Sequence, residues 1–162
     1  MMSQDLKTVV FIALTFLIGM LLTIVPMSQS LVWFRPEWIL MLLFFWVMMT
    51  PHRVAVIGAF FVGLLADLLT GTLFGLHALL FSLTAFFVLY FYVNIHGLPI
   101  WQRALLFFGI LIVYFSLQAW ILSLTGVSVH FWQILAPAVI SAILWPWVYL
   151  LLCDYQQRYE IY

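Results

Sequence analysis

The sequence has little charge and a single cysteine. Only 6% of its 162 residues are Asp, Glu, Lys or Arg, whereas 68% are hydrophobic. Soluble domains are about one quarter charged, and no soluble fold of this length could hide so much apolar surface, so the surrounding solvent must be lipid. The net charge of zero leaves no basic field for nucleic acid. Cys153 alone excludes an internal disulfide, a redox pair and a cysteine-rich zinc site, and we expect an inert thiol within the membrane.

Six apolar segments predict an all-α integral membrane protein with six transmembrane helices. The apolar region over 54–93 would be about 60 Å long as one helix, twice the hydrocarbon thickness, so it must turn near "TGTLFG" at 70–75. A run after Lys7 has the look of a signal peptide but lacks an Ala-x-Ala-like site, so we expect a retained first helix. We expect one polytopic domain over 1–162, with helices at about 7–25, 36–50, 54–70, 76–94, 104–124 and 131–152.

The few basic residues predict the orientation of the chain. With six spans and a cytoplasmic start, Lys7, Arg53, Arg103 and Arg158 would all be cytoplasmic, and only Arg35 would lie outside. Cytoplasmic loops carry the excess of Lys and Arg in membrane proteins. Both termini are therefore expected in the cytoplasm.

One carboxylate lies inside an apolar run, in the stretch "AFFVGLLADLLTGTLFG" at 59–75. Burying Asp67 in a spanning helix costs about 2.5–3.5 kcal/mol, which the surrounding aliphatic and aromatic residues can offset. Counted from Val54 at about 1.5 Å per residue, Asp67 lies about 20 Å along the helix, in its outer half. Two interpretations stay open: a helix-end or hydrogen-bonded packing residue, or an acid that binds a partner or ligand.

Small residues recur every fourth position around this acid, at Ala59, Gly63, Gly71 and Gly75. Small residues at this spacing let helix backbones approach closely in membranes. Glycines also permit the turn that the length of the apolar run demands. We favour the turn for Gly71 and Gly75, and close helix packing for Ala59 and Gly63.

Two short stretches flank the second predicted helix. "FRPEW" at 34–38 places Arg35 and Glu37 at a helix start, where a carboxylate suits the helix dipole and an interfacial cap is a sufficient explanation. "TPHR" at 50–53 breaks the chain after that helix and contributes Pro51, His52 and Arg53 as further candidates.

A proline between two tryptophans lies in the last predicted helix. Pro146 in "LWPWVYLL" at 144–151 frees a carbonyl and should bend the helix. Trp145 and Trp147 would then serve either as lipid-interface anchors or as part of a partner groove.

Catalytic and metal-binding patterns are missing from the sequence. The histidines, His52, His77, His96 and His130, have no His-x-x-x-His or Glu-x-x-His spacing, so we expect no metal site. No Gly-rich phosphate loop and no Gly-x-Ser-x-Gly elbow occurs. We therefore expect neither an enzyme nor a cofactor.

Taken together, these landmarks resemble the MreD family of rod shape-determining membrane proteins. The resemblance spans nearly the whole chain and is carried by "FRPEWILMLLFFWVMMTPHRVAVIGAFFVGLLADLLTGTLFGLHAL" and by "LWPWVYLLL" near the end. It implies a non-enzymatic protein of the bacterial inner membrane within the cell-elongation machinery. It further implies an association with the bitopic protein MreC. Together with MreC, such a protein would link the filament protein MreB to the peptidoglycan polymerase RodA and its partner transpeptidase. The family is also distantly similar to the six-helix substrate-binding subunits of vitamin transporters.

Two functions compete on this basis. The first is a scaffold that binds other membrane helices, with candidate contact or packing residues Gly63, Asp67, Gly71, Gly75, Arg35, Pro51, His52, Arg53, Trp145, Pro146 and Trp147. The second is a transporter-like subunit that binds a small solute. A solute pocket needs several convergent polar groups, and Asp67 is the one carboxylate inside a predicted span, so the scaffold is favoured.

Overall fold

The computed structural model describes residues 2–26, 34–51, 54–127 and 129–158. These residues form seven α-helices and no strand, which confirms the all-helical class. The helices are α1 (Met2–Ile24), α2 (Trp38–Met49), α3 (Val56–Thr70), α4 (Leu76–Tyr90), the short α5 (Tyr92–His96), α6 (Ile100–Leu124) and α7 (Phe131–Arg158).

Three of the described helices are long and apolar enough to cross a bilayer. They are the segments Leu6–Ile24, Ile100–Leu124 and Phe131–Gln157 of α1, α6 and α7. The helices α2, α3 and α4 are also apolar but shorter, with 12, 15 and 15 residues.

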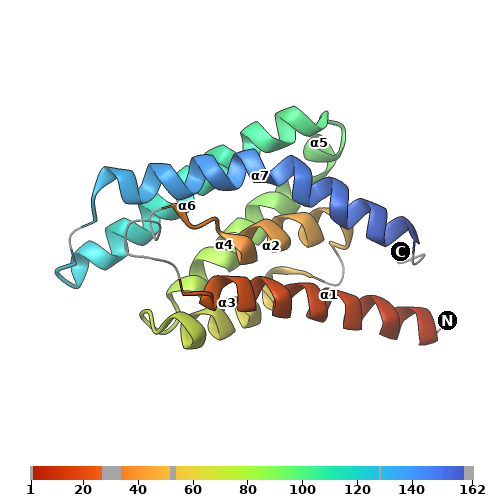
Figure 1. Ribbon diagram of the computed structural model, residues 1–162, viewed down its shortest axis with the longest axis horizontal. Coiled ribbons are helices and arrows are strands. Elements are labelled where there is room, and N and C mark those ends of the chain that lie inside the picture. Colours follow the sequence, from red (N-terminus) through yellow and green to blue (C-terminus); the bar gives the residue numbers. More distant parts are fainter. Residues whose placement is uncertain (1, 27–33, 52–53, 128, 159–162) are drawn as a thin grey trace.

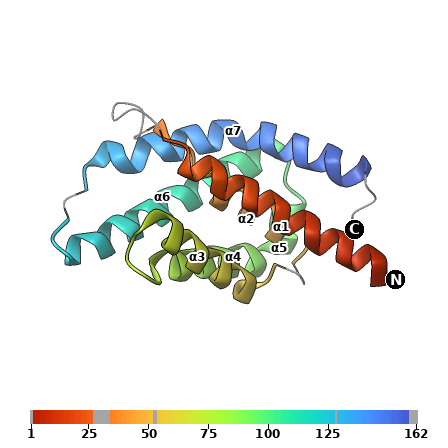
Figure 2. The same ribbon diagram turned by 60° about the horizontal axis from the view of Figure 1, so that its bottom comes forward.

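Apart from the short α5, the described helices run back and forth along the long axis of the molecule (Figure 1). The start of α1 and the end of α7 lie at one end, which we call the terminal end. The α3–α4 turn and the α6–α7 connection lie at the opposite end, which we call the turn end. In the rotated view α1 crosses the molecule between α7 on one side and the α3–α4 pair on the other (Figure 2).

The hydrophobic core is built around α2. This helix is apolar on every side, as expected of a buried helix, and its residues 39–48 are all buried among α1, α4 and α7. Phe44 packs against Phe107 of α6 and Trp145 of α7, with ring centroids 4.8 Å away in each case. The indole nitrogen of Trp46 donates a hydrogen bond of 2.9 Å to the Thr15 hydroxyl of α1.

Several helix ends differ from the expected bounds. The region 94–103, predicted to be a turn, contains the end of α5 and the start of α6, which begins at Ile100. Proline suits a helix start because its missing N–H would have no partner there, and the Pro99 carbonyl accepts the first turn's bonds from Gln102 and Arg103, at 3.0 and 3.1 Å. The last helix extends to Arg158, through a tail that was expected to lie beyond it. The first helix begins at Met2, before the apolar run.

The long helix α7 continues through two prolines, Pro137 and Pro146. It changes direction along its length in both views, as a proline in a helix interior predicts (Figures 1 and 2). The tryptophans beside Pro146 lie on opposite sides of the helix. Trp145 is fully buried in the core, whereas Trp147 is 74% exposed.

At the terminal end, Arg103 joins the start of α6 to its neighbours. Its guanidinium donates hydrogen bonds to the carbonyls of His96 and Leu98 and to the hydroxyl of Tyr149 in α7, at 2.8, 2.8 and 2.9 Å. It also lies 5.5 Å from the centroid of the Tyr149 ring. This cation is therefore held in place by the fold.

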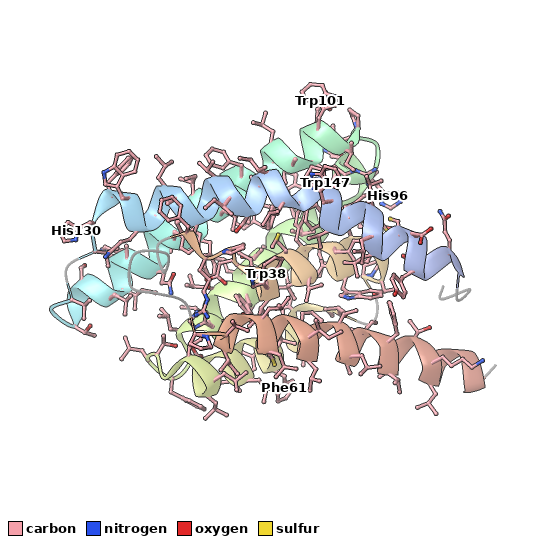
Figure 3. All side chains as sticks on the ribbon, in the orientation of Figure 1. Trp38, Phe61, His96, Trp101, His130 and Trp147 are labelled. Carbon is pink, nitrogen blue, oxygen red and sulfur yellow. The ribbon has the colours of Figure 1, made fainter. Side chains whose placement is uncertain are left out.

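The outer surface of the bundle is strongly apolar. Phe61, Trp101 and Trp147 project outward from three different helices and are each at least 60% exposed (Figure 3). Exposed aromatic and aliphatic side chains at this density suit contact with lipid or with other membrane helices rather than with water.

Candidate functional site

The Asp67 carboxylate is the centre of a hydrogen-bonded cluster between α3 and α4, and its residue is 2% exposed. Its Oδ1 accepts bonds from the Thr72 hydroxyl at 3.0 Å, from the His77 backbone N–H at 3.0 Å and from the His77 ring Nδ1 at 2.7 Å. Its Oδ2 accepts from the backbone N–H groups of Gly75 at 2.8 Å and Ala78 at 3.4 Å. Both carboxylate oxygens are therefore satisfied within the chain.

Asp67 acts as the N-terminal cap of α4. The first N–H groups of a helix have no partner inside the helix, and the α4 cap residue, Gly75, has no side chain to supply one. The carboxylate reaches across from the last turn of α3 and supplies acceptors to this first turn. A negative charge there also complements the positive end of the helix dipole.

Gly63 lets α3 and α4 touch through their backbones. A Cβ added at this position would lie 2.4 Å from the Ala78 Cα and 2.6 Å from the His77 carbonyl oxygen. Neither backbone atom can move without shifting α4. The small-residue face of α3 therefore packs inside the molecule and is not free for a partner.

Gly71 and Gly75 form the turn between the two helices. Their φ angles are +65° and +96°, which residues with a Cβ rarely adopt. A Cβ at either site would have no atom within 4 Å, so the requirement is conformational rather than steric. Of the two interpretations of these glycines, the structure supports the turn.

A polar pocket also lies at the turn end of the molecule. We call it the outer pocket; its volume is about 350 Å³ and its lining includes Arg35, Glu37, Gln118, Gln133 and the apolar wall Phe115, Leu122, Val127, Ile134 and Pro137. The lining side chains come from the segment before α2, from α6 and from α7.

The charged groups of the outer pocket are poorly paired. Arg35 donates from Nη2 to the Val25 carbonyl, while its buried Nε has no acceptor among the described residues. The Glu37 backbone N–H donates to the Ser141 hydroxyl at 2.9 Å. The Glu37 side chain, expected as a helix cap, makes no capping hydrogen bond although Glu37 is the N-cap residue of α2.

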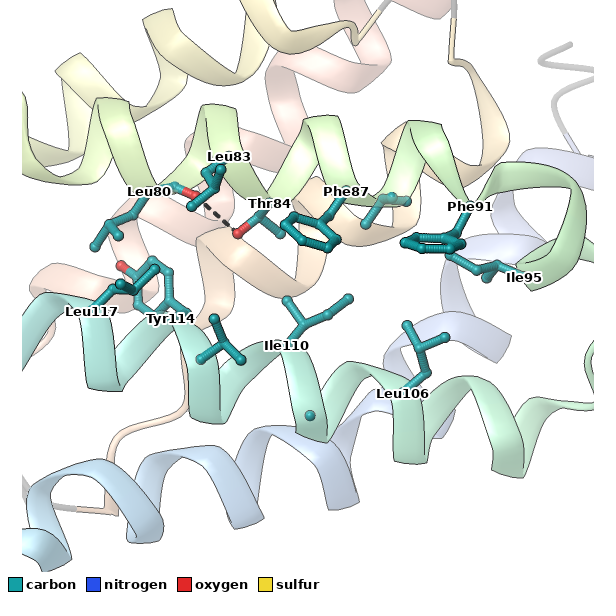
Figure 4. A pocket seen from close by; sticks show the side chains of 13 residues that line it. Leu80, Leu83, Thr84, Phe87, Phe91, Ile95, Leu106, Ile110, Tyr114 and Leu117 are labelled. Carbon is teal, nitrogen blue, oxygen red and sulfur yellow. Dashed lines mark hydrogen bonds between the residues drawn. The ribbon is translucent and has the colours of Figure 1, made fainter.

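An apolar groove runs between α4 and α6, and we call it the α4–α6 groove. Its volume is about 480 Å³, and Figure 4 shows the side chains that line it from Leu80 to Ile95 on one side and from Leu106 to Leu117 on the other. Thr84, one of its two polar side chains, is bonded to the Leu80 carbonyl of its own helix at 2.9 Å. Gly109 is exposed on the α6 wall, and a Cβ there would meet no atom within 4 Å.

The remaining sequence candidates are scattered over the molecule. Pro51 follows the C-cap residue of α2 and is partly buried, while His52 and Arg53 lie outside the described residues. In α7, Trp145 is buried in the core and Pro146 is partly buried. Trp147 faces outward. The structure thus brings together Asp67, Gly71 and Gly75 in one cluster and leaves Arg35 and the Trp145–Trp147 region elsewhere.

Sequence reasoning missed the partners of both polar sites. His77 and Thr72 complete the Asp67 cap, and Gln118 and Ser141 lie at or beside the outer pocket. A histidine two residues after a turn glycine signals a helix start beside the acid, but no local signal pairs Glu37 with Ser141, which is 104 residues away. Within the described part of the chain, no three His, Cys, Asp or Glu residues come close enough to hold a metal ion.

Comparison with known families identifies the protein family to which the chain belongs. A model of the rod shape-determining protein MreD family matches residues 3–154. The chain belongs to the MreD family. It is 27% identical over 151 residues to the rod shape-determining protein MreD of Haemophilus influenzae, and the match covers 91% of each chain. No solved structure matches the sequence. Membership of the MreD family gives this membrane protein a role in determining rod shape.

Proposed function

We propose that the chain is a non-enzymatic scaffold of the bacterial cell-elongation machinery in the inner membrane. It binds the bitopic protein MreC and, with it, links MreB filaments to peptidoglycan synthesis by RodA and its partner transpeptidase. The observation that carries this proposal is the apolar outer surface of a bundle in which Asp67, the acid inside α3, is already satisfied within the chain. Such a bundle offers helix faces rather than reactive groups.

We propose six membrane spans with both termini in the cytoplasm. The six main helices alternate in direction, and the start of α1 and the end of α7 share the terminal end (Figure 1). Lys7, Arg103 and Arg158 belong to that end, whereas Arg35 precedes α2 at the turn end. The positive-inside rule then assigns the terminal end to the cytoplasm. We further propose that this arrangement is similar to the six-helix substrate-binding subunits of vitamin transporters.

Cysteine labelling tests this topology. A cysteine introduced at Gln157, in a Cys153→Ser background, should react with a membrane-impermeant reagent only after the cells are opened. A cysteine at Val127, an exposed residue in the α6–α7 connection, should react in intact cells. The reverse pattern would contradict the proposed orientation.

Recognition of MreC must rest mainly on helix faces. The described connections between helices are short, and the described residues leave no extramembrane domain for a globular contact. In lipid, helices associate through close packing and a few hydrogen bonds, because lipid tails remove the usual hydrophobic drive. The contact surface therefore needs shape complementarity and small residues.

The surface that we propose for the membrane helix of MreC is the α4–α6 groove. From Leu80 to Phe91 the groove follows α4 for about 16 Å, roughly three helical turns, which suits a helix rather than a small solute. Its walls are almost entirely apolar, and the exposed Gly109 allows a second backbone to approach α6 closely. The Gly63 face of α3 cannot serve, because α4 already covers it.

Co-purification and depletion test the proposal. Affinity-tagged chain should capture MreC from solubilised membranes in a fixed ratio, and depletion should round a rod-shaped cell. If depleted cells stayed rods but lost uptake of a vitamin-like solute, the scaffold would be wrong and a transporter-like binding subunit would replace it.

A further inference from the structure

The outer pocket has a composition that the scaffold function does not use. It combines one cation, Arg35, and one carboxylate, Glu37, with an amide from Gln118 and a continuous apolar wall. In the proposed orientation it faces the extracytoplasmic side, because its residues lie at the turn end of the molecule.

The polar atoms of this pocket lack the partners that buried groups normally have. Arginine is always charged and presents N–H donors in a rigid fork, yet the buried Nε of Arg35 has no acceptor among the described residues. The Glu37 carboxylate, which interacts electrostatically with His77 of the Asp67 cap and with Arg35, likewise has no hydrogen bond within the described part of the chain. Leaving a buried donor without an acceptor is unfavourable, so the pocket is suited to receive a further group that supplies one.

The two charges restrict the chemistry of that group. A simple anion would be attracted by Arg35 but repelled by Glu37, and a simple cation would meet the opposite arrangement. A ligand with an oxygen acceptor and a nitrogen donor satisfies both. The wall formed by Phe115, Leu122 and Ile134 then requires a compact apolar body, and the volume of about 350 Å³ is at the small end of the range for ligand sites.

We propose that the outer pocket binds an amino-acid-like group, in which a carboxylate or carbonyl oxygen meets Arg35, an ammonium or amide N–H meets Glu37, and an apolar side chain lies on the α6–α7 wall. The same chemistry is offered by a free amino acid or short peptide and by a backbone segment of a bound membrane protein. The site is separate from the α4–α6 groove and does not depend on MreC binding there.

Four probes with related apolar bodies test the charge requirement on the full chain in lipid nanodiscs. L-leucine carries both charges, N-acetyl-L-leucinamide carries the neutral amide groups, 4-methylpentanoate is an anion only and 3-methylbutylamine is a cation only. Binding is measured by saturation-transfer NMR. We expect leucine or the amide to bind at least about tenfold more tightly than either single-charge probe, a difference of about 1.4 kcal/mol.

Matched variants separate a binding role from a structural one. Glu37→Gln keeps the side-chain shape and should selectively improve binding of 4-methylpentanoate, because the repelling charge is gone. Gln118→Leu should weaken all binding, whereas Gln102→Leu, at the other end of α6, should change nothing. Failure of all four probes to bind the unaltered chain, or unchanged probe preference in Glu37→Gln, would overturn the proposal.

A photo-crosslinking residue at position 127, which lines the pocket but supplies none of its polar groups, distinguishes the two sources in cells. A crosslink to the extracytoplasmic segment of MreC would show that a partner supplies the group. A small bound mass in native mass spectrometry, without a crosslinked protein, would show a free solute. Either result supports the pocket. The crosslink to MreC requires MreC to bind, whereas the four-probe measurement on the chain alone does not, so failure of the pocket and failure of the scaffold function remain distinguishable.

Discussion

The α3–α4 pair and the outer pocket differ in how completely their polar groups are hydrogen-bonded. Around Asp67 every acceptor is used, the helices touch at Gly63, and the buried His77 ring is bonded at Nδ1. Around Arg35 and Glu37, donors and acceptors remain without partners among the described residues. The first arrangement is self-sufficient and therefore structural. The second is incomplete, which is the property expected of a site that receives something from outside.

The largest effect is expected from removing the Asp67 cap. Asp67→Leu leaves the first-turn N–H groups of α4 and the His77 ring without acceptors, which should cost about 3–5 kcal/mol of stability. Asp67→Asn keeps one side-chain oxygen and should cost about 1–2 kcal/mol. Thermal unfolding in detergent measures both. Equal stability of Asp67→Leu and the unaltered chain would show that the cap is not structural.

A pair of glycine substitutions sharpens the comparison between packed and open helix faces. Gly63→Ala places a methyl group against the α4 backbone and should cost about 1–3 kcal/mol through overpacking. Gly109→Ala enters open space on α6 and should stabilise the helix by up to about 1 kcal/mol. The same unfolding assay should therefore show shifts of opposite sign; shifts of the same sign would contradict the close approach at Gly63.

The turn glycines should show an intermediate effect. Gly71→Ala and Gly75→Ala force an L-residue into positive φ, which costs about 1–2 kcal/mol at each position even though the space is open. Chain cleavage by a protease added from the turn side should become faster in both variants. Unchanged cleavage and unfolding would mean that the turn can adopt another geometry.

The smallest effect on stability is expected in the outer pocket. Gln118→Leu removes no internal hydrogen bond among the described residues and should change the unfolding free energy by no more than about 0.5 kcal/mol. A large loss of stability would show that the pocket, like the α3–α4 pair, has a structural role in the internal packing.

The sequence predicted the helical class and much of the α3–α4 turn, because hydropathy and the length limit of a membrane span act locally. The need for a turn near 70–75 followed from that limit, and the positive φ angles of Gly71 and Gly75 form this turn. The cap partners of Asp67 were not predicted, since α4 must fold back before Gly75 and His77 reach the acid. Proline at position 99 was placed inside a turn, although it also suits a helix start.

Tertiary contacts account for the other differences. Trp145 and Trp147 are alike in the sequence, and only the packing of α7 on Phe44 and Phe107 buries one of them. The outer pocket joins residues from position 35 to position 137, and no local pattern brings such distant groups together. The burial of α2, by contrast, follows directly from a helix that is apolar on every side.

The most direct test of the scaffold uses capture of MreC by three forms of the tagged chain: unaltered, Gly109→Phe and Gly109→Ala. Gly109→Phe fills the α4–α6 groove from an open position, so it should keep the unfolding temperature of the unaltered chain while losing most of the MreC. Gly109→Ala should retain capture. Full capture by Gly109→Phe, in a protein that is as stable as the unaltered chain, would contradict the proposed contact of MreC with this groove.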